Sequence, residues 1–257
     1  SASGIAVQPD GKIVQTGYCD WVVTASGTAT PAKFCAIRYL PNGTLDPTFA
    51  TAGRLMMDMV PVPSPRPTGF VGSHASSVVV QPDGKVVVSG TCSSGATVVT
   101  PKFCLLRLTA SGTPDSQFGP AHDGKVITAV LGVSVRKTQA NALALQSDGK
   151  LIVAGDCESD LVAPTTRGFC SIRVHGASAS GVQAGTVDTS YGAGGTAVIT
   201  VGPVNDSATG VALQADGKVV IGGWCARVGS ALIDMCAARL TANGLSDVSF
   251  GTNGATV

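Results

Sequence analysis

The pentapeptide Q-x-D-G-K occurs four times in this 257-residue chain, and this repetition limits the fold more than any other feature. It occupies residues 8–12, 81–85, 146–150 and 214–218, with spacings of 73, 65 and 68 residues. A fixed period of this size is the signature of a repeat architecture, in which each repeat is one supersecondary unit. We therefore divide the chain into repeats over about residues 1–72, 73–137, 138–205 and 206–257, within one domain at 1–257.

Each repeat contains the same order of strand signals. In SVVVQPDGKVVVSG at 77–90, Pro82 presets its own φ, Asp83 favours a turn and Gly84 accepts a positive φ. A second strand ends in Gly-x-Cys, a third carries Cys-x-x-Arg, and a short fourth strand closes the repeat. The pattern predicts four antiparallel strands per repeat, with a hairpin turn at each Q-x-D-G-K.

A four-stranded repeat cannot bury both of its faces alone, so neighbouring repeats are expected to stack face to face. Sheets of four strands that pack radially form β-propellers of four to eight blades. The sequence therefore predicts an all-β fold, a four-bladed β-propeller with four antiparallel strands per blade. A β-solenoid is the linear alternative, but its rungs are shorter and are not built from hairpins. Whether four blades close a ring alone stays open at this point.

Two pairs of segments carry a resemblance to a known family. They are QPDGKVVVSG with RLTASGTPDSQFG, and QADGKVVIGG with RLTANGLSDVSFG. In these motifs the chain resembles the delta-60 type of bacterial β-propeller repeat, and all four repeats show the pattern. The resemblance implies a secreted or surface module without an assigned reaction. Ala50, where the pattern has glycine after the aromatic residue, and the extra segment HGASASGVQAG in the third repeat depart from it.

Composition and charge exclude several classes of protein. The net charge is +1, so we expect no nucleic-acid partner. Only 13% of residues are charged and Glu158 is the sole glutamate, which disfavours long surface helices. No apolar run approaches the roughly 20 residues that span a bilayer, so we expect no membrane insertion. The first candidate strand begins within five residues of Ser1, which fits either a processed mature chain or a trimmed one.

The eight cysteines fall two per repeat, where the second strand ends and the third begins. Eight cysteines allow 105 pairings, and the repeat selects the one with a disulfide inside each blade. We expect the two residues of a pair to face each other across the mouth of one hairpin loop. Disulfides at this density indicate the periplasm, the cell surface or the extracellular medium. The predicted pairs are Cys19 with Cys35, Cys92 with Cys104, Cys157 with Cys170, and Cys225 with Cys236.

An arginine of the third strand and an aspartate of the following turn recur in every repeat. Four arginines near one axis would suit an anion site. Alternatively, each arginine pairs with the aspartate of its own turn or with backbone carbonyls, a role that the planar guanidinium favours. We prefer the structural alternative. The residues are Arg38, Arg107, Arg173 and Arg239, with Asp46, Asp115, Asp188 and Asp247.

Two further groups are candidates for binding. Asp156, Glu158 and Asp160 fall in what we expect to be one variable loop, and are a weak candidate for a cation site because calcium loops with glycine and a fixed spacing of ligands are more specific than this pattern. Trp21 and Trp224 lie beside cysteines and suit either stacking on a sugar or packing over a disulfide. We expect no cofactor, apart from an ion or water in the axial channel of a ring.

The segments between paired cysteines differ from repeat to repeat, whereas the turns at the opposite end are nearly identical. Loops held by a rigid scaffold are the usual place for binding. We therefore expect a secreted or surface-exposed, noncatalytic protein that binds or scaffolds through this variable face, with a protein, an extracellular assembly or a glycan as partner. The alternatives are a subunit of a filament, sheath or surface layer, and an extracellular polysaccharide hydrolase or lyase. No pair of carboxylates or nucleophile elbow specifies a catalytic site.

Overall fold

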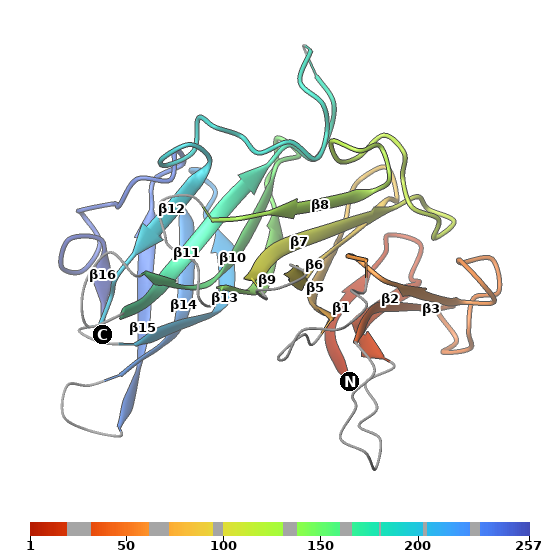
Figure 1. Ribbon diagram of the computed structural model, residues 1–257, viewed down its shortest axis with the longest axis horizontal. Coiled ribbons are helices and arrows are strands. Elements are labelled where there is room, and N and C mark those ends of the chain that lie inside the picture. The colour runs from red at the N-terminus through yellow and green to blue at the C-terminus, as the bar shows by residue number, and fades with distance from the viewer. Residues whose placement is uncertain are drawn as a thin grey trace. The chain divides into compact units, whose positions relative to one another are not determined.

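The computed structural model describes residues 1–19, 32–61, 72–94, 100–130, 138–159, 166–179, 181–202, 205–226 and 232–257. Within these ranges every regular element is a β-strand (Figure 1). The strands form four antiparallel sheets of four strands each, and in every sheet spatial order follows chain order. The predictions of an all-β fold and of four strands per repeat are confirmed. In the same ranges no helix is long and apolar enough to cross a membrane.

The bounds of the strands follow the four repeats. The first sheet comprises β1 (Ala2–Val7), β2 (Ile13–Cys19), β3 (Lys33–Tyr39) and β4 (Arg54–Met57). The second comprises β5 (Ser73–Val80), β6 (Val86–Ser94), β7 (Thr100–Leu108) and β8 (Lys125–Thr128). The third comprises β9 (Thr138–Leu145), β10 (Leu151–Ser159), β11 (Thr166–Val174) and β12 (Thr196–Ile199). The fourth comprises β13 (Asp206–Leu213), β14 (Val219–Ala226), β15 (Ile233–Leu240) and β16 (Ala255–Thr256).

The chain forms two compact units, Ser1–Thr128 and Ala129–Val257, and each unit contains two sheets. In the first unit, side chains such as Phe34 and Ala36 of the first sheet share a buried cluster with Val86 and Leu106 of the second. In the second unit, an equivalent cluster joins the third and fourth sheets. Sheet faces thus bury their apolar residues against each other inside each unit, as stacking of repeats requires. A single domain over the whole chain stays a prediction.

The Q-x-D-G-K turns have the same hydrogen bonds in all four sheets. In the first, the Gly11 N–H donates to the Gln8 carbonyl at 2.9 Å, and the Lys12 N–H donates to Asp10 Oδ1 at 3.2 Å. Gly11 has a φ of 80°, a conformation that residues with a Cβ rarely adopt. Glycine and aspartate recur because this turn geometry is built four times.

Candidate functional site

All four predicted disulfides are present, one within each sheet. The Cα atoms of each pair are 5.9–6.0 Å apart, a normal separation for a disulfide. The paired cysteines face each other across the end of the hairpin, as expected, but on a diagonal, because the register places a glycine directly opposite the second cysteine. In the fourth sheet, Cys236 pairs across the ladder with Gly223, and Cys225 pairs with Asp234, so the disulfide is diagonal.

The glycine of the Gly-x-Cys motif is needed for a close approach of backbones. The first strand of each sheet shifts register beside it, for example between Ala208 and Gly210. A Cβ on Gly223 would lie 1.9 Å from the Ser207 carbonyl oxygen, so no larger residue fits without movement of the strand. The sequence showed that this glycine recurs, but the shift of register that explains it lies in the neighbouring strand.

At the turn end of each sheet, the recurring arginine and aspartate form an ion pair, which is buried in the first three sheets and partly buried in the fourth. The distance from arginine Nε to aspartate Oδ2 is 2.8 Å in all four sheets. The guanidinium also lies 4.5–4.8 Å from the centre of the aromatic ring that follows the aspartate. The structure therefore places each arginine on the aspartate of its own turn. The rings belong to Phe49, Phe118, Tyr191 and Phe250.

The lysine of Q-x-D-G-K belongs to the same cluster. Lys150 Nζ lies 2.9 Å from Asp148 of its own turn and 3.5 Å from Asp188. Burial alone would raise the pKa of Asp188, but the hydroxyl and N–H of Ser190, together with the charge of Arg173, lower it to about 2. Each of the four clusters is thus an ionised network whose charges are paired within the protein.

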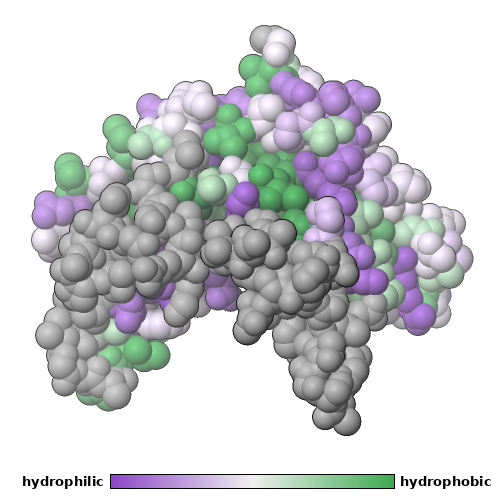
Figure 2. Space-filling view, viewed as in Figure 1, coloured by the Kyte–Doolittle hydropathy of each residue, from purple (hydrophilic) through white to green (hydrophobic). Residues whose placement is uncertain are grey.

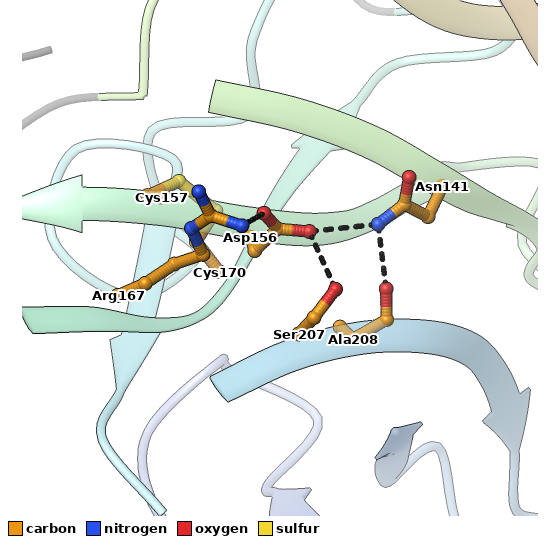
Figure 3. Close-up of a disulfide and its surroundings, with 7 residues drawn as sticks. All are labelled: Asn141, Asp156, Cys157, Arg167, Cys170, Ser207 and Ala208. Atoms are coloured by element: carbon orange, nitrogen blue, oxygen red, sulfur yellow. Dashed lines mark hydrogen bonds and ion pairs between the residues drawn. A yellow bond between two sulfur atoms is a disulfide. The ribbon is translucent and has the colours of Figure 1, made fainter. Parts of the chain in front are cut away.

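A second polar network lies beside the disulfide of the third sheet (Figure 3). Asp156 lies in β10 and is 2% exposed. Its Oδ1 accepts hydrogen bonds from Asn141 Nδ2 at 2.8 Å and from Ser207 Oγ at 3.0 Å, and its Oδ2 lies 3.4 Å from Arg167 Nη1. Asn141 also donates to the Ala208 carbonyl at 2.7 Å. The network therefore connects the third sheet to β13 of the fourth.

Burial raises the pKa of Asp156, although the Arg167 charge and the two hydrogen bonds oppose the shift. Burial also raises the pKa of Asp206, whose Oδ2 accepts the N–H groups of Val201 and Gly202. These two carboxylates differ from those of the turns because fewer charged partners compensate their desolvation. The sequence singled out Asp156 but not its partners, since Asn141 and Ser207 come from other strands.

The expectation that Asp156, Glu158 and Asp160 share one loop is wrong for the first two residues. Asp156 and Glu158 lie in strand β10 rather than in a loop, and Asp160 lies outside the described residues. Both oxygens of Asp156 already face protein donors. Among the residues that the structure describes, no group of three or more His, Cys, Asp or Glu side chains is placed to hold a metal. The cation site through Asp160 stays a prediction.

Of the two candidate tryptophans, the structure describes Trp224. Trp21 lies outside the described residues. Trp224 lies in β14, is half-buried, and pairs across the ladder with Met235 of β15. Met235 is 90% exposed and Ile233 is 60% exposed, so an apolar surface surrounds Trp224. In Figure 2, hydrophobic residues are exposed at the lower left, where β15 begins in Figure 1.

Comparisons with known proteins address the fold. The family model described as "Domain of unknown function (DUF5122) beta-propeller" matches residues 8–49, 81–118 and 214–250. These segments run from the Q-x-D-G-K turn to the aromatic residue of the first, second and fourth repeats. No curated protein matches this chain.

Two solved structures are similar. A protein of unknown function from Dyadobacter fermentans DSM 18053 is 10% identical, with 97% of this chain and 65% of that chain covered and a TM-score of 0.49. An exo-1,5-alpha-L-arabinanase from a bovine ruminal metagenomic library is 13% identical, with 92% and 69% covered and a TM-score of 0.40. The chain spans about 65% of the length of the first. With four equivalent disulfide-bonded sheets and three segments that match a β-propeller family model, the chain is a β-propeller repeat protein.

Proposed function

We propose that this chain is a secreted or surface-exposed, noncatalytic β-propeller of the delta-60 type that binds a partner through its variable face. We define the variable face as segments 20–31, 95–99, 160–165 and 227–231. Each segment lies, in the sequence, between the two cysteines of one disulfide. Four disulfides indicate an oxidising compartment, which supports an extracellular or periplasmic location.

The observation that carries this proposal is the contrast between the two ends of each sheet. At the turn end, the same arginine, aspartate and lysine occur in every sheet and their charges are paired with each other. At the other end, sequences differ between sheets while a disulfide fixes the strands that carry them. A fixed base with variable segments is the arrangement that binding proteins use.

Site-specific photo-crosslinking in the organism that makes the protein tests this proposal. A photoreactive amino acid replaces Val98 or Ser230 on the variable face. In matched controls it replaces Asp83 or Asp216, whose side chains are 54% and 56% exposed in the turns of the same two sheets. We expect discrete adducts from the first pair of positions alone. Equal adducts from the turn positions, or none from either variable segment, would contradict the proposal.

A further inference from the structure

Asp206 of β13 is fully buried, and one of its two carboxylate oxygens lacks a partner. Oδ2 accepts the N–H groups of Val201 and Gly202 at 2.8 and 2.9 Å. Oδ1 accepts no hydrogen bond from any residue that the structure describes. A buried acceptor without a donor is unfavourable, and more so when it belongs to a charged group. Asp206 therefore offers an acceptor at which a new donor would be stabilising.

The unpaired oxygen lies beside the disulfide of the fourth sheet. Asp206 stands directly opposite Cys225 in the ladder of β13 and β14. The next pair along the ladder is hydrogen-bonded, because the Ala226 N–H donates to the Asn205 carbonyl at 2.9 Å. Such pairs alternate with non-hydrogen-bonded ones, in which the side chains are closer, so Asp206 and Cys225 form a close pair. A Cβ placed on Gly202 would lie 2.5 Å from Asp206 Oδ1 and 2.9 Å from Cys225 Cβ.

The second and third sheets carry hydroxyl side chains at this position instead. Ser73 stands opposite Cys92, Thr138 stands opposite Cys157, and both hydroxyl residues are buried. Thr138 Oγ1 also lacks a partner among the described residues. A neutral hydroxyl, however, loses less on burial than a carboxylate does. A carboxylate beside the first cysteine therefore distinguishes the fourth disulfide from these two.

Reduction of the fourth disulfide supplies the missing donor. The sulfur atoms of a disulfide carry no hydrogen, whereas a cysteine thiol has a weak S–H donor. The thiol of Cys225 can donate to Asp206 Oδ1, and the oxidised form has no equivalent of this bond. The reduced form of the fourth sheet thus gains an interaction with a carboxylate that the reduced second and third sheets do not gain.

We propose that Cys225–Cys236 is a redox-responsive site, which dithiols reduce more readily than the disulfides of the second and third sheets because the Cys225 thiol donates to Asp206. One thiolate of the dithiol bonds to the sulfur of Cys236, the more exposed of the two cysteines, and Cys225 leaves as a thiolate. The second thiolate of the dithiol then displaces Cys236 and closes the disulfide of the dithiol. The dithiol loses two electrons and two protons, and the two cysteine sulfurs take them up.

The site also bears on the variable face. Segment 227–231 lies between Cys225 and Cys236 in the sequence, so reduction removes the covalent bond that closes this loop. This consequence rests on the function proposed above. The redox equilibrium does not, because it depends only on Asp206 and the disulfide, so either can fail without the other.

A redox titration read by mass spectrometry tests this proposal. The protein is equilibrated at pH 7 with mixtures of reduced and oxidised dithiothreitol, and its thiols are alkylated with one isotopic label before full reduction and with another after it. The reduced fraction of each disulfide gives its midpoint potential. An equilibrium measurement does not depend on how the dithiol reaches the buried sulfur atoms.

Two variants of Asp206 remove the acceptor in different ways. In Asp206→Asn, the oxygen can still accept the N–H groups of Val201 and Gly202, while Nδ2 faces Cys225 and cannot accept from a thiol. Asp206→Ser copies the second sheet. Circular dichroism establishes that each variant is folded. The matched control is Asp234→Asn, since Asp234 stands opposite Cys225 on its other side, in β15, and is only half-buried.

We expect the wild-type midpoint of Cys225–Cys236 to lie above those of the second and third disulfides. Both Asp206 variants should lower its equilibrium constant for reduction about tenfold, which is a shift of about 30 mV toward more negative potential. Cys92–Cys104 in the same molecules should not move, and Asp234→Asn should change the constant less than twofold. An unchanged midpoint in both Asp206 variants, an equal shift of all four disulfides, or the same shift in Asp234→Asn would overturn the proposal.

Discussion

The aspartates of this protein include two groups whose pKa values are shifted in opposite directions. The aspartates of the Arg–Asp clusters are held ionised by hydroxyl, N–H and guanidinium donors, and their pKa values are lowered. Asp156 and Asp206 are buried with fewer compensating charges, and their pKa values are raised. The two groups should therefore give the free energy of unfolding opposite dependences on pH.

For Asp188, the folded pKa of about 2 lies below the ordinary value of 3.8. Its stabilisation is present above pH 3.8 and is lost as the pH falls toward 2. Asp188→Asn should therefore lower the free energy of unfolding at pH 7 by about 2 kcal/mol, and flatten its dependence on pH between 4 and 2. Urea unfolding at each pH measures this. The exposed Asp83→Asn is the control, and an equal loss in that variant would contradict the assignment.

For Asp156 the sign is reversed, because the folded pKa is raised above 3.8. Its contribution to stability is fully present below pH 3.8 and falls as the pH rises through the folded pKa. Asp156→Asn cannot ionise, so its stability relative to the wild type should increase as the pH is raised above 3.8 and become constant above the folded pKa of Asp156. The same series of urea unfolding curves measures the difference. A constant difference across this range would show that Asp156 does not titrate differently in the folded state.

Ala50 shows how one departure from the repeat pattern costs stability. It has a φ of 47°, and the equivalent residues of the other three sheets are glycines with positive φ. Alanine is strained in this conformation by roughly 1–2 kcal/mol, whereas glycine loses about 0.5–1 kcal/mol of backbone entropy. Ala50→Gly should therefore raise the free energy of unfolding by about 0.5–1 kcal/mol in urea denaturation. A decrease would mean that the methyl group makes a compensating contact.

At the scale of strands and sheets, the glycine opposite the second cysteine controls how closely the first strand approaches. Gly222 and Gly223 are neighbours in β14 and provide a matched pair. A Cβ on Gly223 would meet the Ser207 carbonyl at 1.9 Å, whereas nothing lies within 4 Å of a Cβ on Gly222. Gly223→Ala should lower stability by about 1–3 kcal/mol, while Gly222→Ala should leave it within about 0.5 kcal/mol. Equal losses in thermal unfolding would contradict the register of β13 and β14.

The disulfides also act on one sheet each, since every pair lies within a single repeat. The paired cysteines are separated by 11 to 16 residues, and loops of this size give about 3 kcal/mol of stabilisation in the chain-entropy model. Replacing any one pair by two serines should cost about this amount, with differences below roughly 0.5 kcal/mol among the pairs of the first three sheets. Urea unfolding of the four double variants measures this, after peptide mass mapping of the wild type has identified the bonded pairs. Bonds between different repeats would contradict it.

At the scale of the whole molecule, the four disulfides together are comparable with the total stability of a typical domain. Their summed contribution is on the order of 10 kcal/mol, and domains are usually stable by about 5–15 kcal/mol. The fully reduced chain should therefore lose its strand signal in circular dichroism at 25 °C, and regain it on reoxidation. A reduced chain that keeps its native spectrum would show that sheet packing alone is sufficient.

Much of this architecture could be predicted from the sequence, because each repeat confirms the others. The turn at Gly84, the pairing of Cys92 with Cys104 and the salt bridge of Arg38 with Asp46 all follow from local patterns that recur. The network at Asp156 could not be predicted, since Asn141 and Ser207 come from strands distant in the chain and have no counterpart in the other repeats.

The order of the disulfides along the chain has a consequence for biogenesis. Every cysteine is bonded to the one immediately before or after it, at a separation of 11 to 16 residues. A nascent polypeptide that leaves the translocation channel with its amino end first therefore exposes each thiol together with its correct partner. For a chain exported as proposed above, oxidation in order of emergence would give the native set of disulfides directly, with little demand on a disulfide isomerase.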